Sequence, residues 1–348
     1  MLKFLFFYFL AFLLINVFLL FRIFVPDMKM SIWFIVNPIS GTKDKEHIIA
    51  LIPEYIDPAR FNYEIRYTEH AGHAAEITRE AIAQGIDIVV AVGGDGTVNE
   101  VARALIHTET ALGIIPCGSG NGLARHLALP MNPRGALQII NECTIHRLDY
   151  GRINGRPFFC TAGMGFDANL SDNFAKAGRR GLITYVENAL RLGMAYESET
   201  YTLEYVTEDW KIHTDTVKAF LLTCANAGQY GNNFWIAPKA SMQDGLMDVS
   251  IIEPFPLIES GPIAYQMVHK TIYRNPRCQS FKCRNITIQR EHPGVIHYDG
   301  DPAEETSMVR VEIVPHDILM LVNIRKHGPR PHQAISKDFL EKLHRGLS

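Results

Sequence analysis

The sequence predicts a two-domain protein, in which an α/β domain with a doubly wound parallel sheet is followed by a mainly antiparallel β-sandwich domain. From residue 31 to about residue 140, strand-like and helix-like segments alternate, which favours a parallel sheet covered by helices on both faces. After residue 144 the pattern changes to short strands separated by turns. The chain has 348 residues and 47% hydrophobic content, which is enough for two cores.

The elements of the α/β domain follow from the hydrophobic pattern. Short apolar runs, most of them rich in β-branched residues, indicate strands at residues 32–36, 63–67, 87–92 and 111–116. Helical spacing of apolar residues indicates helices at residues 44–55, 71–84 and 98–106. We place this domain at residues 31–143.

The second domain, at residues 144–326, is predicted from strand-like runs and turn signals. Asn154-Gly155 is typical of a two-residue hairpin, here between strands at residues 149–153 and 157–160. Further strands are expected at residues 201–206, 218–225, 247–252, 285–289, 309–314 and 318–322, and helices at residues 183–194 and 257–269.

A hydrophobic segment, residues 1–27, precedes the two domains. Residues 4–21 carry no charge, and their length reaches the lower end of a bilayer span. The flanking basic residues weakly place the rest of the chain on the cytoplasmic side. The sequence therefore predicts a single-pass anchor on the cytoplasmic face of the membrane, with a cleaved signal peptide or a start at Met28 or Met30 as alternatives.

Composition excludes several classes of protein. The net charge is −3 and no run of five basic residues occurs, so nucleic-acid binding is not expected. The six cysteines have no repeating metal-ligand spacing and are interpreted as reduced thiols. The 14 histidines form no ligand-like cluster in the sequence and do not suggest zinc.

Glycine-rich loops follow three predicted strands. They are Asn37-Pro38-Ile39-Ser40-Gly41, Gly93-Gly94-Asp95-Gly96-Thr97 and Gly118-Ser119-Gly120-Asn121. Because the carboxyl ends of parallel strands share one sheet edge, the loops should converge there. Glycines allow close approach to a ligand, and N–H groups at a helix start favour phosphate. A phosphate beside Asp95 would need a metal ion or other cation to offset the charge.

These loops, in this order, resemble the catalytic domain of the diacylglycerol and sphingosine kinase family. A further motif of the family is matched by Thr68-Glu69-x-x-Gly72-His73-Ala74, in which x is any residue. Segments 238–249 and 297–301 are similar to the family's later motifs. The resemblance extends over residues 31–326 and implies the two-domain fold shared with NAD kinases. It also implies that a short C-terminal helix, at residues 333–348, packs back on the first domain.

The resemblance implies a nucleotide site for ATP. Thr97 and Ser119 would offer hydroxyl groups to phosphates, although Thr97 at a helix start is also explained as an N-terminal cap. The complete set of residues expected at the nucleotide is Asn37, Ser40, Thr68, Gly93, Gly94, Asp95, Gly96, Thr97, Asn99, Gly118, Ser119 and Asn121.

Acidic residues are the candidates for catalysis. Asp299 and Asp301 flank Gly300 where the family usually has Asp-Gly-Glu, so either is a candidate general base, and Asp95 is the third catalytic candidate. The shorter Asp301 leaves open how the two residues divide the roles of base and metal ligand. An Asp-Gly turn in a hairpin is the alternative interpretation.

The resemblance also implies a structural Mg²⁺ held through the carboxylate of Asp244 and through backbone carbonyls, which map to Leu246 and Ser241. An oxygen-rich site with few carboxylates suits Mg²⁺, which keeps several of its waters. Without the resemblance, this segment would be interpreted as a turn.

The lipid substrate is less constrained. Gly122 stands where many bacterial diacylglycerol kinases have Asp, as a small residue does in sphingosine kinases, which favours a sphingoid base somewhat. The ammonium group of such a lipid would need a carboxylate, for which Asp167 or Asp172 is available. Both residues are equally well explained as a cap or a turn.

The sequence therefore predicts an ATP- and Mg²⁺-dependent lipid kinase that phosphorylates a primary hydroxyl of diacylglycerol or a sphingoid base at a membrane surface. An enzyme similar to NAD kinase and a membrane-tethered lipid or nucleotide sensor without turnover are the alternatives. A homodimer is an assembly that the sequence leaves open.

Overall fold

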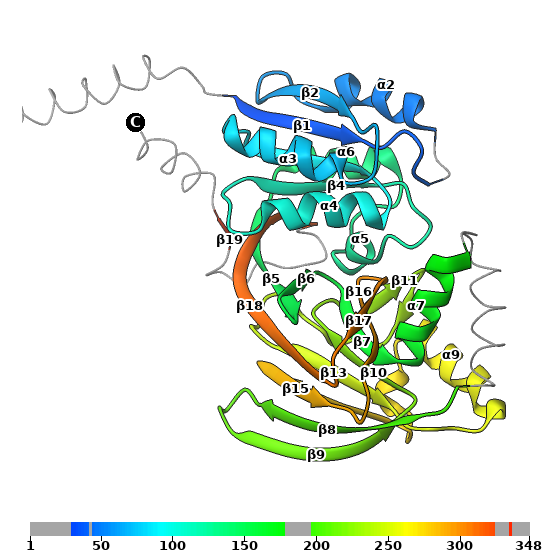
Figure 1. The fold of residues 1–348 in the computed structure, drawn as a ribbon. Coiled ribbons are helices and arrows are strands. Elements are labelled where there is room, and N and C mark those ends of the chain that lie inside the picture. Colours follow the sequence, from blue (N-terminus) through cyan, green and yellow to red (C-terminus); the bar gives the residue numbers. More distant parts are fainter. Residues whose placement is uncertain (1–28, 42–43, 178–195, 324–333, 336–348) are drawn as a thin grey trace, which may run out of the picture.

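The computed structural model describes residues 29–41, 44–177, 196–323 and 334–335 (Figure 1). The anchor predicted at residues 4–21 and the helix predicted at residues 183–194 lie outside these ranges, as does nearly all of the predicted C-terminal helix. Among the described residues, no helix is both long enough and apolar enough to cross a membrane.

The first domain contains a parallel sheet with the strand order β2-β1-β3-β4. Its strands are β1 (Met30–Val36), β2 (Phe61–Tyr67), β3 (Ile88–Gly93) and β4 (Ala111–Pro116). Its helices are α2 (Lys45–Tyr55), α3 (His73–Ala83), α4 (Asp95–Leu105), α5 (Gly122–His126) and α6 (Pro133–Glu142). The predicted alternation of strands and helices is confirmed.

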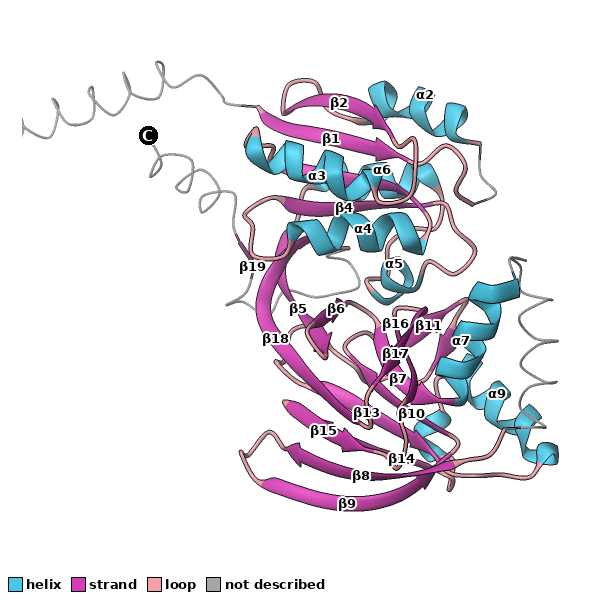
Figure 2. Cartoon of the chain, viewed as in Figure 1, coloured by secondary structure: helices cyan, strands magenta, loops and turns pink. Residues whose placement is uncertain are grey.

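Alternating side chains of β1 explain why helices lie on both faces of this sheet, because successive residues of a strand point to opposite sides. Trp33 and Ile35 belong to a core that contains residues of α3 and α4. Ile32 and Phe34 belong to a second core with residues of α2 and α6. The sheet is therefore doubly wound, as predicted (Figure 2).

The second domain is a β-sandwich. One layer is an antiparallel sheet with the order β14-β13-β10-β7-β16-β17, and the other contains β18, β15, β8 and β9. Met164 and Leu222 from the first layer share a buried core with Leu203 and Ile286 from the second. The predicted fold class is therefore confirmed for this domain as well.

The strands and helices of this part of the chain are β5 (Ile145–Ile153), β6 (Arg156–Phe158), β7 (Thr161–Gly165), α7 (Phe166–Ala177), β8 (Glu199–Val206), β9 (Ile212–Ala219), β10 (Leu221–Ala225), β11 (Gln229–Gly231), β12 (Phe234–Trp235), β13 (Met247–Ile252), η1 (Leu257–Glu259), α9 (Ser260–Val268), η2 (Ile272–Arg274), β14 (Cys278–Cys283), β15 (Asn285–Gln289), β16 (Gly294–Tyr298), β17 (Asp301–Glu305), β18 (Met308–Leu321) and β19 (Ala334–Ile335).

One predicted turn is confirmed and one predicted strand is not. Asn154 and Gly155 both have positive φ, as a two-residue hairpin turn between β5 and β6 requires. The strand predicted at residues 218–225 is wrong, because β9 ends at Ala219 and β10 begins at Leu221 in the opposite layer. The apolar pattern continues through this crossing because both strands bury side chains.

Strand β18 joins the two domains. Its first part pairs with β15 of the sandwich, whereas Met320 pairs with Leu112 of β4 in the first domain. The register of β18 against β5 shifts between Val314 and Ile318, and this irregularity lies between the two parts. The two strands predicted at residues 309–314 and 318–322 are thus one continuous strand.

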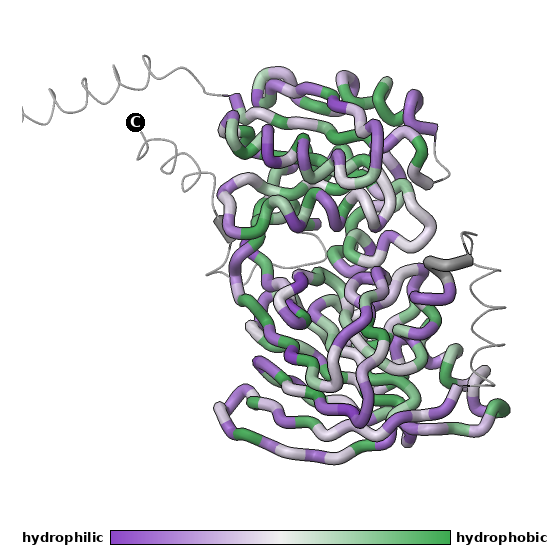
Figure 3. The backbone as a smooth tube through the Cα atoms, in the orientation of Figure 1, coloured by the Kyte–Doolittle hydropathy of each residue, from purple (hydrophilic) through white to green (hydrophobic). Residues whose placement is uncertain are grey.

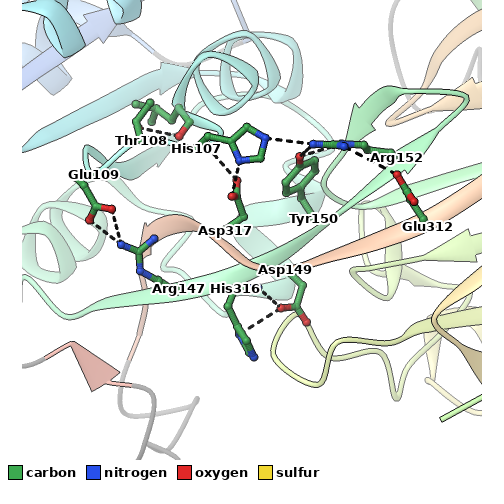
Figure 4. A network of polar contacts seen from close by, with 11 residues as sticks. His107, Thr108, Glu109, Arg147, Asp149, Tyr150, Arg152, Glu312, His316 and Asp317 are labelled. Carbon is green, nitrogen blue, oxygen red and sulfur yellow. Dashed lines mark hydrogen bonds and ion pairs between the residues drawn. The ribbon is translucent and has the colours of Figure 1, made fainter. Parts of the chain in front are cut away.

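A polar network surrounds the irregularity in β18 (Figure 4). The Asp317 carboxylate accepts a hydrogen bond from the His107 backbone N–H at 2.9 Å and contacts His107 Nδ1 at 2.5 Å. Arg152 lies 3.1 Å from His107 Nε2 and donates to the Tyr150 hydroxyl at 2.6 Å. Because His107 follows α4, the network connects that helix to the strands that join the domains.

The side chain of Asp149 connects the irregular part of β18 to the loop around Gly245. Its buried carboxylate accepts hydrogen bonds at 2.8 Å from the backbone N–H groups of His316 and Gly245. Burial raises the pKa of Asp149, although these two hydrogen bonds oppose the shift. The contact places the loop around Gly245 next to the domain junction.

Candidate active site

The three predicted glycine loops meet at the carboxyl edge of the parallel sheet. A Cβ atom on Gly41 would overlap the carbonyl oxygen of Cys117, and one on Gly118 would lie 2.8 Å from the Cα atom of Gly94. The loops therefore touch backbone to backbone, and side chains at these glycines would separate them. Gly41 also has φ of 67°, a conformation that favours glycine.

The first loop is shaped by its own polar groups. Asn37 Oδ1 accepts a hydrogen bond from the Ile39 N–H at 3.2 Å, and the Ser40 hydroxyl donates to the Asn37 carbonyl at 3.1 Å. Lys45 Nζ donates to the Ser40 carbonyl at 2.5 Å. The sequence analysis did not single out Lys45, which brings a cation to the loop edge.

Thr97 connects the first and second loops. Its buried hydroxyl accepts a hydrogen bond from Asn37 Nδ2 at 3.1 Å, and its side chain fills the space that a Cβ on Gly93 would occupy. Helix α4 begins at Asp95 with Gly94 as its N-cap, so the interpretation of Thr97 as the cap is wrong.

Asp95 binds the third loop. Its two carboxylate oxygens accept hydrogen bonds from the backbone N–H groups of Asn121 at 2.8 Å and Gly122 at 2.7 Å. Gly120 must lack a side chain, because its Cβ would lie 2.8 Å from Asp95 Oδ2. The carboxylate thus holds the loop in position. A direct catalytic role for Asp95 stays a prediction, and these contacts count against it.

Other side chains fix the shape of the third loop from within. Asn121 Oδ1 accepts from the Gly118 N–H at 2.9 Å, and Asn121 Nδ2 donates to the Gly118 carbonyl at 2.6 Å. Arg125 Nε donates to the Gly120 carbonyl at 2.9 Å. Ser119 is left exposed at the tip of the loop. Backbone N–H groups and this hydroxyl are therefore what the loop presents to a ligand.

The motif at residues 68–74 lies next to α4. Thr68 is buried and its N–H donates to the Val36 carbonyl at 3.0 Å. Glu100 accepts hydrogen bonds from the N–H groups of Gly72 at 3.0 Å and Ala74 at 3.2 Å, at the start of α3. Asn99 is buried on α4. Glu100 therefore positions this motif, a role that the sequence analysis missed.

Three side chains beside this motif could approach a metal ion. Ligand atoms of His70, His73 and Glu76 lie within 4.8 Å of one another. His73 Nδ1, however, accepts a hydrogen bond from the Glu69 N–H at 3.0 Å, which puts the proton of the neutral ring on Nε2. The tautomer that makes this hydrogen bond cannot also ligate a metal through Nε2.

The second domain contacts the third loop directly. The Asn232 N–H donates to the Gly120 carbonyl at 3.2 Å, and a Cβ on Gly231 would lie 3.1 Å from Gly120 Cα. A Cβ on Gly122 would lie 3.5 Å from Cys160 Sγ. A methyl group on Gly122 would therefore make only ordinary van der Waals contacts with the second domain.

Asp299 lies at the far side of Cys160. Its Oδ1 accepts hydrogen bonds from the N–H groups of Cys160 at 2.7 Å and Thr161 at 3.2 Å, and its Oδ2 from the Phe159 N–H at 2.7 Å. Burial raises the pKa of Asp299 to about 6, against the lowering effect of these hydrogen bonds. Asp299 and Gly300 form a two-residue turn with positive φ between β16 and β17.

Asp301 pairs with the first domain. Its Oδ2 lies 2.9 Å from Arg103 Nη2, and the Arg103 guanidinium lies over the Tyr298 ring at 5.1 Å. Because Arg103 belongs to α4, the helix that starts at the second loop reaches the Asp299-Gly300 turn at its other end. Residues 299–300 are therefore a hairpin turn and, at the same time, lie against the first domain, so the hairpin does not exclude a role in the active site.

A series of neighbouring residues connects the two sides. Asp95 binds the Gly122 N–H, Cys160 Sγ lies 3.5 Å from where a Cβ on Gly122 would be, and the Cys160 N–H binds Asp299. Burial raises the pKa of the Cys160 thiol well above its usual range, and the charges of Asp299 and Asp95 add to the shift. Cys160 is thus the residue that lies between Asp299 and the third loop.

Asp167 is the centre of a buried polar cluster in the second domain. Its Oδ2 accepts hydrogen bonds from the hydroxyls of Thr223 and Tyr230, both at 2.9 Å, and lies 3.0 Å from His297 Nε2. Its Oδ1 accepts from the Ala168 N–H at 2.9 Å. Tyr230 precedes the glycine that contacts the third loop, so the cluster lies near the glycine loops. Asp172 lies further along α7 and is half-buried.

The segment predicted to hold Mg²⁺ is contacted by the ammonium group of Lys282, a residue of β14. Lys282 Nζ lies 2.7 Å from Asp244 Oδ2 and 3.0 Å from Asp248 Oδ2. Asp244 Oδ1 accepts from the Leu246 N–H at 3.2 Å, and Ser241 Oγ accepts from the Gln243 N–H at 3.3 Å. These donors occupy the carboxylate that a metal would need, so the residues as placed do not fit a divalent ion. Mg²⁺ at Ser241, Asp244 and Leu246 stays a prediction.

Comparisons with known proteins agree with this geometry. The model of the diacylglycerol kinase catalytic domain matches residues 31–153, and that of the YegS C-terminal NAD kinase beta sandwich-like domain matches residues 160–322. A "Probable lipid kinase YegS-like" of Xanthomonas campestris pv. campestris (strain 8004) is 32% identical over 268 residues, 72% of this chain and 84% of that protein.

Two further proteins are similar over most of their length. The "Diacylglycerol kinase" of Bacillus subtilis (strain 168) is 29% identical over 273 residues, 77% of this chain and 88% of that protein. A crystal structure of a diacylglycerol kinase from Bacillus anthracis str. Sterne superposes with a TM-score of 0.65 at 20% identity, covering 84% of this chain and 97% of that one. The second similarity extends to the fold.

Proposed function

Because this chain belongs to the lipid kinase family of the diacylglycerol kinase catalytic domain, whose members are phosphotransferases, we propose that it transfers the terminal phosphoryl group of ATP to the primary hydroxyl of diacylglycerol at a membrane surface. The observation that carries this proposal is the series of neighbouring residues from Asp95 through Gly122 and Cys160 to Asp299. It brings a candidate base of the second domain to the phosphate-binding edge of the first.

The glycine loops are suited to hold the polyphosphate of ATP. Their backbones approach one another at Gly41, Gly94 and Gly118, so the loops form one edge of backbone. The start of α4 adds the positive end of a helix dipole. Lys45 supplies a positive charge at the same edge. Mg²⁺ carried by the nucleotide would offset the remaining phosphate charge.

Asp299 is the base that the geometry favours. A pKa near 6 leaves the carboxylate ionised at neutral pH yet able to accept a proton, which is the balance that a general base needs. Three backbone N–H groups fix its orientation. Asp301 is instead paired with Arg103, so we assign it to holding the two domains together at the turn.

The proposed reaction is a single displacement. The lipid hydroxyl gives its proton to Asp299 while its oxygen forms a bond to the terminal phosphorus of ATP. The bond between that phosphorus and the bridging oxygen breaks, and ADP leaves with the electron pair. Positioning and neutralisation of charge supply most of the catalysis in such transfers.

Contacts of Asp167 favour a neutral acceptor over a sphingoid base. An ammonium group would have to share a carboxylate whose Oδ2 already accepts from Thr223 and Tyr230 and contacts His297. Diacylglycerol, which carries no charge near its hydroxyl, requires no such exchange of partners.

The test is a direct assay of the purified full chain. We would incubate it with Mg²⁺ and labelled ATP, together with dioleoylglycerol, sphingosine or NAD, and identify the products by mass spectrometry. The proposal expects phosphatidic acid and little or no sphingosine phosphate. Formation of NADP, or hydrolysis of ATP without a phosphorylated lipid under any condition, would contradict it.

A further inference from the structure

One helical segment of the second domain exposes an uncharged surface. Residues 257–269, from η1 through α9, have their exposed positions on one side when placed at the helical spacing of 100° per residue. Large apolar side chains on this side include Ile258, which is 85% exposed, and Tyr265, which is 63% exposed. The exposed side consists of Leu257, Ile258, Gly261, Pro262, Tyr265, Val268 and His269.

The opposite side of this segment is firmly packed. Ile263 and Met267 are buried in a core with Leu221 of β10 and Ile252 of β13. The usual arrangement of a surface helix, with polar groups outward, is therefore absent from residues 257–269. Figure 3 shows hydrophobic colour on this peripheral part of the second domain. A contiguous apolar surface of this kind is typical of a contact with another body.

Basic side chains border the apolar surface. Lys270 Nζ lies 3.8 Å from the centroid of the Trp235 ring, and the Arg274 guanidinium lies over Tyr273 at 5.5 Å. Lys239 Nζ lies 4.2 Å from the centroid of the same tyrosine ring. The three cations thus gather at the end of α9, held by aromatic rings.

Acidic side chains in the same stretch are already engaged. Residues 253–277 contain two of them, Glu253 and Glu259. Glu259 pairs with Arg277 at 3.2 Å, and Glu253 accepts from Gln279 at 2.7 Å. Four basic side chains, Lys239, Lys270, Arg274 and Arg277, outnumber these two carboxylates, so the border of the surface carries a net positive charge.

This surface lies on the same side of the six-stranded sheet as the Asp167 cluster. Leu221, which packs under α9, and Thr223, which binds Asp167, are two residues apart on β10 and so point to the same side. A partner or membrane that covers η1 and α9 would thus lie on the side of the sheet that carries the Asp167 cluster.

We infer that this surface, defined by Leu257, Ile258, Tyr265 and Val268 with Lys239, Lys270 and Arg274 at its border, docks onto a membrane containing anionic lipid. The inference rests on the proposed function, which requires a substrate that resides in a bilayer. Apolar groups enter the boundary between headgroups and acyl chains, and tyrosine is favoured there. Cations at the border attract anionic headgroups, whereas a purely apolar protein partner would gain nothing from them.

Hydrogen exchange on the full chain tests the inference without depending on the predicted N-terminal anchor. The protein is incubated with nanodiscs of phosphatidylcholine alone or with phosphatidylglycerol, and backbone exchange is followed by mass spectrometry. We expect residues 257–270 to be protected more strongly when phosphatidylglycerol is present, and this protection to be lost in the double variant Ile258→Glu/Tyr265→Glu. The matched control is Ile212→Glu, which changes a 71% exposed isoleucine on β9 and should retain the protection.

Three results would overturn the inference. One is equal exchange of residues 257–270 in both kinds of nanodisc, and another is unchanged protection in the double variant. The third is protection of wild-type protein in detergent that rises with protein concentration, which would make the surface an interface between two copies of the chain.

A second readout separates this inference from the proposed function. The same samples are assayed with dioctanoylglycerol, which reaches the enzyme from solution. Turnover of this lipid by the double variant, together with lost protection, supports both proposals. Absence of turnover in the wild type with protection intact would contradict the kinase reaction and leave the docking surface standing.

Discussion

The proposed nucleotide edge of the first domain and the proposed acceptor side of the second domain are built in different ways. The edge is made of backbone, and its glycines are needed because neighbouring loops touch at Gly41, Gly94 and Gly118. The acceptor side is made of buried side chains, among them Asp167 and His297, that come from separate strands and helices.

This difference has a consequence for function. A backbone edge presents N–H groups that suit any polyphosphate, so it fixes the phosphate donor without selecting the acceptor. A cluster of side chains offers specific charges and hydrogen-bonding groups, so in our proposal it is the part that discriminates between acceptors. We therefore expect substitutions in the first domain to change the handling of ATP, and substitutions in the second to change lipid turnover.

The largest effect is expected at Asp299. Replacing Asp299 with Asn removes the proposed base, and kcat should fall by about 10²–10⁴-fold because this is the usual contribution of a general base. In the wild type, kcat/KM should fall as the pH drops below about 6, since protonation of Asp299 removes the acceptor of the proton. Steady-state kinetics between pH 5 and pH 9 measure both effects.

Asp301→Asn is the matched control for this experiment. It removes the ion pair with Arg103 and leaves Asp299 in place, so the loss of kcat should be smaller and the acidic limb of the profile should remain. An Asp301→Asn enzyme that loses the acidic limb, beside an Asp299→Asn enzyme that keeps it, would reverse the assignment.

A smaller effect is expected from Gly118→Ala. The new methyl group would lie 2.8 Å from Gly94 Cα and 3.0 Å from Asn121 Oδ1, so the two loops must separate at a cost of about 1–3 kcal/mol. The KM for ATP should rise by roughly tenfold while the KM for lipid changes little. Gly261→Ala, where open space surrounds the added methyl group, serves as the control. An unchanged KM for ATP in Gly118→Ala would place the nucleotide elsewhere.

Substitutions in the Asp167 cluster should lower the free energy of unfolding. His297→Leu removes a partner of the buried Asp167 carboxylate, and the free energy of unfolding should fall by about 1–3 kcal/mol. His292→Leu changes an exposed histidine and should shift it by less than about 0.5 kcal/mol. Denaturant titration compares the two variants, and equal stability would mean that His297 contributes nothing to the cluster.

The smallest effect concerns Lys282. Without nucleotide, Mg²⁺ should leave the melting temperature of the wild type unchanged, because the ammonium of Lys282 already balances Asp244 and Asp248. Lys282→Met should lose about 1 kcal/mol of stability, since its ion pairs are partly exposed, and should then be stabilised by Mg²⁺. A wild-type melting temperature that rises with Mg²⁺ would instead support the metal site predicted from the family resemblance.

Local patterns predicted the first domain well. Strands β1, β3 and β4 are each marked by a short apolar run followed by a glycine-containing loop, and the carboxyl ends of parallel strands must share an edge. The sequence could not predict which loop residues bind ligand and which hold the loops. Asp95 and Asn121, for example, were expected at the nucleotide and are engaged with loop backbone.

Contacts between distant residues were beyond the reach of sequence patterns. Arg103 and Asp301 are 198 residues apart, and Lys282 and Asp244 are 38 apart, so no periodicity relates them. The same applies to β18, whose two halves were predicted as separate strands although one strand crosses both domains. Tyr230 also belongs to the Asp167 cluster, although no motif in the sequence around residue 230 predicts this contact.

A structure of the full chain with a non-hydrolysable ATP analogue and dioctanoylglycerol tests most directly whether the two regions form one active site. We predict that the terminal phosphate binds N–H groups of the loops that contain Gly94 and Ser119, with the lipid hydroxyl between that phosphate and the Asp299 carboxylate. A nucleotide bound away from these loops, or a lipid hydroxyl that Asp299 cannot reach, would contradict the account.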